Sequence, residues 1–111
     1  FERGTSLTLA GERLHLISGT ASIDKYGKCL YHGDVVAQTE RLFLNIEQLL
    51  VDGGAGMKDL QYLIVYLRDV ADYSAVNTYL QENFSGIPYL ITAARVCRPE
   101  WLIEVETVAI S

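Results

Sequence analysis

DVVAQTERLFLNIEQLLVDGGAG, residues 34–56, carries the clearest structural pattern in the chain. Its apolar face is spaced at steps of three and four and consists of Val35, Thr39, Leu42, Ile46 and Leu49. That spacing predicts an amphipathic α-helix. Asp34 precedes it as a suitable N-cap, and the glycine-rich run at 53–56 predicts its end.

The opposite face of the predicted helix is polar. It carries Gln38, Arg41, Asn45 and Gln48. Side chains of these types are usually solvated on the outer face of a helix. We therefore expect all four to lie in water.

Before this helix the pattern predicts strands. Residues 6–10 alternate weakly, and residues 13–23 form a second run that leads into a glycine-containing turn. The intervening turn is expected at 11–12. Turn residues follow at 24–28, and 29–33 is a short return strand or loop.

After the helix the pattern switches to a buried strand and a second helix. Residues 60–70 are apolar without clean alternation, which is typical of a strand covered on both faces. Asp72 is the expected cap of the second helix. The apolar side of that helix comprises Val76, Tyr79, Leu80 and Phe84. Two more strands, 89–97 and 101–110, are separated by a turn at Arg98-Pro99 and are expected to form a hairpin.

This element order predicts an α+β two-layer sandwich, with one mixed sheet and two helices on one of its faces. Several predicted strands are apolar on both sides. The second sheet face therefore needs a cover, and burial between copies of the chain is the simplest cover.

Composition limits the function classes. The 111 residues carry a net charge of −5 and no basic run, which argues against a nucleic-acid partner. No apolar stretch reaches the length of about 18–20 residues that a membrane span needs. Two cysteines are too few for a disulfide scaffold, so a reduced, cytoplasmic protein is expected. The chain reads as a single domain over residues 1–111, and its start without methionine suggests an excised or C-terminal portion of a longer chain.

Several segments together resemble the RidA/YjgF family, which also bears the name endoribonuclease L-PSP. They are SG at 18–19, the stretch 33–84, IP at 87–88 and IEVE at 103–106. The resemblance covers about residues 13–110. It implies a chorismate-mutase-like α+β fold, a homotrimer and a cleft between each pair of subunits. We expect no metal and no cofactor.

The resemblance also implies site residues. Gly19 matches the backbone glycine of the family's cleft, Asn77 matches a helix asparagine, and Glu104 matches a glutamate that positions a catalytic water. RidA proteins grip the substrate carboxylate with an arginine two residues after the proline that opens the penultimate strand. Leu90 stands at that position in this chain.

A second and narrower resemblance is to the C-terminal half of the chorismatases, which hydrolyse chorismate and release pyruvate. It depends on SGTASI at 18–23, HGD at 32–34 and CRPEWLIEVE at 97–106. It implies that Glu104 is the acid/base and that Cys97 lines the pocket. Chorismatase-like hydrolysis is accordingly the first function expected.

Other candidate residues follow from the pattern. A carboxylated substrate needs a guanidinium, and antiparallel pairing of 89–97 with 101–110 would place Arg95 near Glu104. Tyr26, Tyr31 and Tyr89 are candidate cleft walls or interface residues. Glu106 shares the strand face of Glu104 and is expected at the rim.

The cysteine and histidine side chains give weaker indications of a function. Cys97 has no neighbours at metal-ligand spacing, so no metal site is predicted. His15 and His32 are given no catalytic role.

Three functions stay open at this point. The first is the chorismatase-like enzyme. The second is a RidA-type enamine/imine deaminase with a displaced arginine. The third is a non-catalytic trimer that binds a small acid or serves in assembly. In all three the expected ligand is a small carboxylated metabolite.

Overall fold

The computed structural model describes residues 4–24, 26, 28–94 and 101–111. Its strands and helices are, in chain order, β1 (Gly4–Leu9), β2 (Glu12–Thr20), α1 (Val35–Asp52), β3 (Leu60–Leu67), α2 (Tyr73–Asn83), β4 (Tyr89–Ala93) and β5 (Ile103–Ile110). Two short 3-10 turns, Met57–Asp59 and Val70–Asp72, precede β3 and α2.

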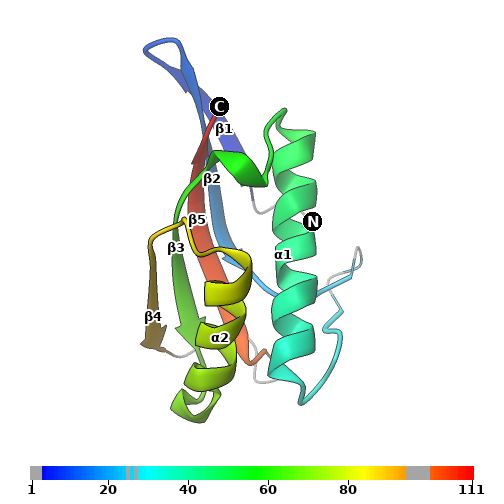
Figure 1. Cartoon of the computed structure of the whole chain (residues 1–111). Coiled ribbons are helices and arrows are strands. Elements are labelled where there is room, and N and C mark those ends of the chain that lie inside the picture. The colour runs from blue at the N-terminus through cyan, green and yellow to red at the C-terminus, as the bar shows by residue number, and fades with distance from the viewer. Residues whose placement is uncertain (1–3, 25, 27, 95–100) are drawn as a thin grey trace.

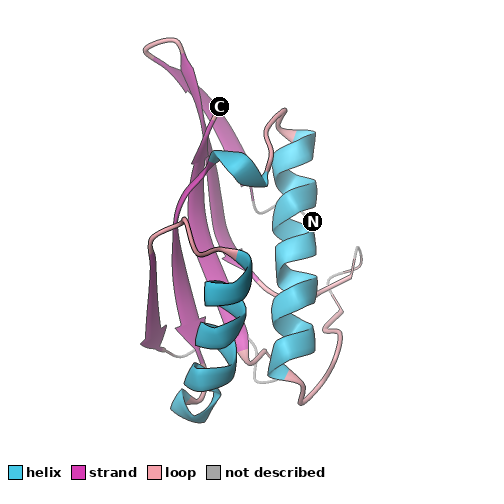
Figure 2. Ribbon diagram, in the orientation of Figure 1, coloured by secondary structure: helices cyan, strands magenta, loops and turns pink. Residues whose placement is uncertain are grey.

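The described strands form one mixed sheet in the order β1-β2-β5-β3-β4. Only β3 and β4 are parallel, and the other neighbours are antiparallel. Both helices cover the same face of this sheet (Figures 1 and 2). The predicted α+β two-layer sandwich is therefore confirmed.

The expected C-terminal hairpin is wrong. β5 lies between β2 and β3, and β4 pairs with β3 at the edge of the sheet. The reason is the α2 crossover, which returns the chain parallel to β3. β5 then takes the central place, where its residues Ile103, Val105 and Ala109 are fully buried.

The N-terminal hairpin exists, with its turn one residue earlier than predicted. Ala10 and Gly11 both have positive φ, 52° and 83°, and Leu9 pairs with Glu12. Two central residues with positive φ define the tight turn that suits the twist of a hairpin. Segment 29–33 is a loop. It is tied to the preceding chain by a bridge between Ile23 and Cys29 and by the Leu30 N–H, which donates to the Ser22 carbonyl at 3.0 Å.

Helix α1 begins and ends as its sequence predicts. The Asp34 carboxylate accepts a hydrogen bond of 3.0 Å from the Ala37 N–H, and Gly53 follows the last turn. Leu42, Ile46 and Leu50 on the sheet side of α1 are fully buried. These three side chains form one core cluster with Leu63 and Val65 of β3.

Helix α2 completes the core. Val76 and Leu80 are buried against the sheet, while Tyr79 and Phe84 join Phe43 of α1 in an aromatic cluster. The Phe43 and Phe84 ring centroids are 4.5 Å apart. The expected cap differs, because Asp72 makes no side-chain capping bond.

Asp69 takes the capping role one turn earlier. Its carboxylate accepts the Ala71 N–H at 2.9 Å, and this bond fixes the 3-10 turn that leads into α2. The pKa of Asp72 is raised by burial and by the neighbouring charge of Asp69.

The sheet face away from the helices is called here the open sheet face. It exposes Leu16 of β2, Tyr62 of β3 and Leu90 of β4, with exposed fractions of 38%, 40% and 60%. Tyr66 and Val108 on the same face are half-buried. Exposed apolar side chains gathered in this way indicate an interaction surface.

Among the described residues, no helix is both long and apolar enough to cross a membrane.

Candidate active site

Glu104 lies in the middle of the central strand, on the open sheet face. Its neighbours Ile103 and Val105 point toward the helices and are fully buried. Alternation along β5 then directs Glu104 to the other side, where it is only 8% exposed even in the single chain. A glutamate on the solvated face of a strand would be far more exposed.

Tyr66 stands opposite Glu104 on β3. Its pKa is raised, first by burial and then by the negative charge of Glu106, a hydrogen bond to Glu106 and the charge of Glu104. The tyrosine hydroxyl therefore stays protonated and can donate a hydrogen bond within a pair of carboxylates. Glu106, expected only at the rim, is part of this cluster.

An apolar wall borders the cluster. Ala21, Ile23, Cys29 and Trp101 form a second buried cluster, and Tyr66 packs against it. Trp101 is only 1% exposed. Three of these residues belong to the segment that follows β2, and Trp101 lies just before β5.

Polar residues of α1 hold this wall in place. The Gln38 side chain donates to the Tyr31 carbonyl at 3.1 Å and accepts from the Leu102 N–H at 2.9 Å. Asn45 donates to the carbonyls of Ala21 and Ile23 at 2.9 and 3.0 Å.

These contacts correct the expectation that the polar face of α1 is solvated. Gln38 is fully buried, and Arg41 donates to the Ile23 carbonyl at 3.2 Å. One feature of the sequence indicates the burial of Gln38. Gln38 is four residues before Leu42 and eight before Ile46, so it lies on the same side of the helix as these buried residues.

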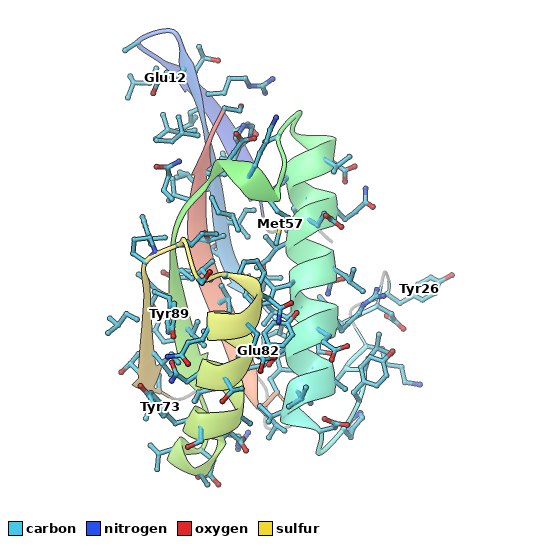
Figure 3. The ribbon with its side chains drawn as sticks, viewed as in Figure 1. Glu12, Tyr26, Met57, Tyr73, Glu82 and Tyr89 are labelled. Atoms are coloured by element: carbon cyan, nitrogen blue, oxygen red, sulfur yellow. The ribbon has the colours of Figure 1, made fainter. Side chains whose placement is uncertain are left out.

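Asn77 and Tyr89 lie elsewhere in the chain. The Tyr89 hydroxyl donates to the Asn77 side-chain oxygen at 2.6 Å, which links β4 to α2. Tyr89 packs against the main core, on the helix side of the sheet (Figure 3). Within one chain the sheet therefore separates these two residues from Glu104.

The other candidates are placed as follows. Gly19 belongs to β2, at an irregularity between Ile17 and Thr20 where the register with β5 shifts. Leu90 aligns with Ile64, and Ile64 pairs with Glu106 in turn, so Leu90 lies on the open sheet face.

Arg95 and Cys97 lie outside the described residues. The antiparallel pairing that would bring Arg95 to Glu104 is absent between β4 and β5, which β3 separates.

The histidines lie outside this cluster. His15 is buried, with one ring nitrogen 2.8 Å from the Ser6 hydroxyl and the other 2.8 Å from the Ser111 hydroxyl. His32 is exposed. Across the described part of the chain, no group of three histidine, cysteine or acidic residues is arranged to hold a metal ion.

Solved structures define the class of protein that this fold represents. The YjgF gene product of E. coli superposes with a TM-score of 0.81 at 20% identity, covering 99% of this chain and 87% of that chain. Rv2704 of Mycobacterium tuberculosis, a member of the YjgF/YER057c/UK114 family, gives 0.80 at 20% identity, covering 100% and 86%. The class is thus the small YjgF-like α+β sandwich.

The chain belongs to the endoribonuclease L-PSP family, also called RidA/YjgF, whose profile matches residues 6–111. A curated relative is the 3-aminoacrylate deaminase RutC of Acinetobacter baylyi. It is 32% identical over 96 residues, which cover 84% of this chain and 75% of the relative.

This relative overturns the chorismatase-like function. The chorismatase resemblance depended on three short segments, whereas the similarity to the deaminase extends over 96 residues. The similarity favours the second of the three functions expected from the sequence, a RidA-type deaminase.

Proposed function

We propose that this protein is a RidA-type deaminase that hydrolyses a small enamine or imine bearing a carboxylate. The observation that carries the proposal is the sequence similarity to a 3-aminoacrylate deaminase over most of the chain. The burial of Glu104 beside Tyr66 supports it, because deamination needs a group that both gives and takes a proton.

The reaction is balanced with water alone. Protonation of the enamine carbon gives an iminium ion. Water adds to the iminium carbon and loses a proton, which gives a carbinolamine. A proton then moves from the hydroxyl to the nitrogen, ammonia leaves and a carbonyl remains. We assign the first proton to Glu104 in its acid form. Its conjugate base then takes a proton from the attacking water.

Tyr66 has a supporting role in this proposal. Its hydroxyl stays protonated beside Glu104 and Glu106, so it can donate a hydrogen bond to the nitrogen or to the adding oxygen. The wall that contains Trp101 restricts water on one side of the site.

The substrate carboxylate requires an arginine other than the one that Leu90 replaces. Two arginines are candidates, Arg95 from the sequence and Arg68 from the register. Arg68 follows β3, its N–H bonds the Leu102 carbonyl at 3.1 Å, and alternation puts it on the face of Tyr66. A guanidinium there can bind a carboxylate through two parallel hydrogen bonds.

A homotrimer belongs to the same proposal. Three copies would bury the open sheet face, and each cleft would combine Glu104 of one subunit with residues of the next. Gly19 and Asn77 are proposed to line these clefts on the strength of the family resemblance. Cys97, from the spacing of the last strand, and Tyr89, as an aromatic wall, are proposed to line them as well. Cytoplasmic location and membership of a longer chain also stay predictions.

The test is ammonia release from 3-aminoacrylate and, separately, from the enamine formed by serine dehydration. We expect hydrolysis of 3-aminoacrylate above the uncatalysed rate. The serine-derived enamine bears its carboxylate on the carbon that carries the nitrogen, so a comparison of the two rates shows which carboxylate position the site accepts. Arg68→Ala and Arg95→Ala are compared, and the variant that raises KM identifies the carboxylate ligand. No acceleration with either substrate contradicts the proposal.

Leu90 supports one alternative, a trimer that binds a small acid without turning it over. Calorimetry with a stable, unreactive carboxylate such as propanoate distinguishes the two. Binding together with an absence of ammonia release would identify a binding protein.

A further inference from the structure

The outer surface of the helix layer carries a shallow groove between α1 and α2, on the side away from the sheet. Val36, Glu40 and Leu44 line it from α1, at steps of four residues. The α2 side comprises Ser74, Ala75, Thr78, Tyr79, Glu82 and Asn83. Figure 3 shows Glu82 on the α2 side of the space between the two helices.

The groove combines an apolar floor with acidic edges. Leu44 and Val36 are exposed, at 57% and 38%, although they belong to an otherwise well-packed helix. Tyr79 is held in position by stacking on Phe43, with ring centroids 6.0 Å apart. Side chains of this kind, placed at helical spacing on two neighbouring helices, form a surface on which a third helix can pack.

The charges of the groove have one sign. Glu40 and Glu82 are both exposed, and none of the described residues that line the groove is lysine or arginine. Arg41, the single basic residue of the two helices, donates to the Ile23 carbonyl. The negative charge of Glu40 also reaches Tyr79, whose pKa is raised by burial and then by Glu40.

We propose that this groove docks a cationic amphipathic helix of a partner protein, with lysine or arginine side chains against Glu40 and Glu82 and apolar side chains over Leu44 and Val36. A second copy of this chain does not fit, because its own helices would bring like charges together. The groove is on the opposite side of the molecule from the open sheet face, so assembly through that face leaves it accessible. The inference is independent of the deaminase activity.

The probe is a synthetic amphipathic peptide of about 18 residues with leucines on one face and lysines beside them. The matched peptide has glutamate in place of every lysine. Titration of the full chain is followed by backbone amide chemical shifts and by fluorescence anisotropy. We expect shifts along residues 36–44 and 75–83 with the lysine peptide, and none with the glutamate peptide.

Variants separate the groove from general charge attraction. Glu40→Lys with Glu82→Lys should raise Kd by about tenfold or more, because both edge charges become repulsive. Glu47→Lys is the control, since Glu47 is exposed on α1 but does not line the groove. Leu44→Ser should weaken binding, whereas Val51→Ser, at 58% exposure on the same helix, should not.

Three results would overturn the proposal. They are an equal loss with Glu47→Lys, shifts that map to the open sheet face, and no binding of the lysine peptide. Circular dichroism of each variant confirms that the fold is retained.

Discussion

At the scale of single residues, Tyr66 and the two glutamates of β5 form one electrostatic unit. The carboxyl groups of Glu104 and Glu106 lie on the same strand face, and Tyr66 forms a hydrogen bond with Glu106 beside them. The tyrosine is therefore the group whose ionisation reports on the state of the site.

We predict that Glu106→Gln lowers the pKa of Tyr66. The substitution removes both the negative charge and the charged acceptor that stabilise the neutral phenol, so the phenolate becomes easier to form. Burial remains and keeps the pKa above that of an exposed tyrosine. Ultraviolet absorbance titration of Tyr66 checks this, with Tyr66→Phe to identify its signal. An unchanged or higher pKa would show that Glu106 does not contact the hydroxyl.

The sequence could identify Glu104 as a candidate but could not show its environment. Alternation placed Glu104 and Glu106 on one face, and the structure agrees. Glu104 is buried opposite Tyr66 of β3, and Tyr66 packs against a wall to which Ala21, Ile23 and Cys29 contribute from the segment after β2, far from Glu104 in the sequence. Alternation within one strand carries no information about such partners.

At the scale of elements, helix α1 both builds the core and fixes the chain around the site. Gln38 ties the loop that contains Tyr31 to the residue before β5. Without Gln38 the Leu102 N–H would lose this acceptor in a partly buried place, which is costly, whereas the Tyr31 carbonyl also accepts from the Asp34 N–H at 3.2 Å.

We predict that Gln38→Ala lowers the free energy of unfolding by about 2 to 4 kcal/mol, through the lost packing, the unsatisfied Leu102 N–H and the lost hydrogen bond to the Tyr31 carbonyl. Urea denaturation measures the change. Gln48→Ala is the matched control on the same helix. Gln48 is exposed and bonds only the Asp52 carboxylate, so a change within about 0.5 kcal/mol is expected. Equal effects of the two substitutions would argue against the anchoring role.

Prediction of the elements succeeded where local signals decide them. Asp34 and the glycines after Asp52 fixed the ends of α1, since capping and left-handed backbone are local properties. Prediction failed for the pairing of β4 and β5. The place of β4 beside β3 depends on the crossover through α2. The alternation of side chains along β4 would be the same whether β4 paired with β3 or with β5, so the sequence pattern could not distinguish the two.

At the scale of the whole molecule, the open sheet face is the feature that a single chain leaves unexplained. Leu16, Tyr62 and Leu90 expose apolar surface on the side opposite the helices. Burial between copies would remove this surface from water, at about 25 cal/mol per Å² of apolar area.

We predict that the protein is a trimer at micromolar concentration and that Tyr62→Asp dissociates it. A charge at this position would be buried without a partner in the interface. Light scattering coupled to size-exclusion chromatography gives the mass. Val51→Asp, on the outer side of α1, should remain trimeric. A wild-type monomer, or a Tyr62→Asp trimer as stable as wild type, would show that the open sheet face is covered in another way.

The measurement that tests the account most directly is the rate of ammonia release from 3-aminoacrylate by the wild-type chain and by Glu104→Gln. Glutamine keeps the size of the side chain but cannot serve as the acid or the base. We predict a rate about 100- to 10,000-fold lower for the variant, with the circular dichroism spectrum and the mass of the assembly unchanged. A Glu104→Gln variant that releases ammonia at the wild-type rate would contradict the central role given to Glu104.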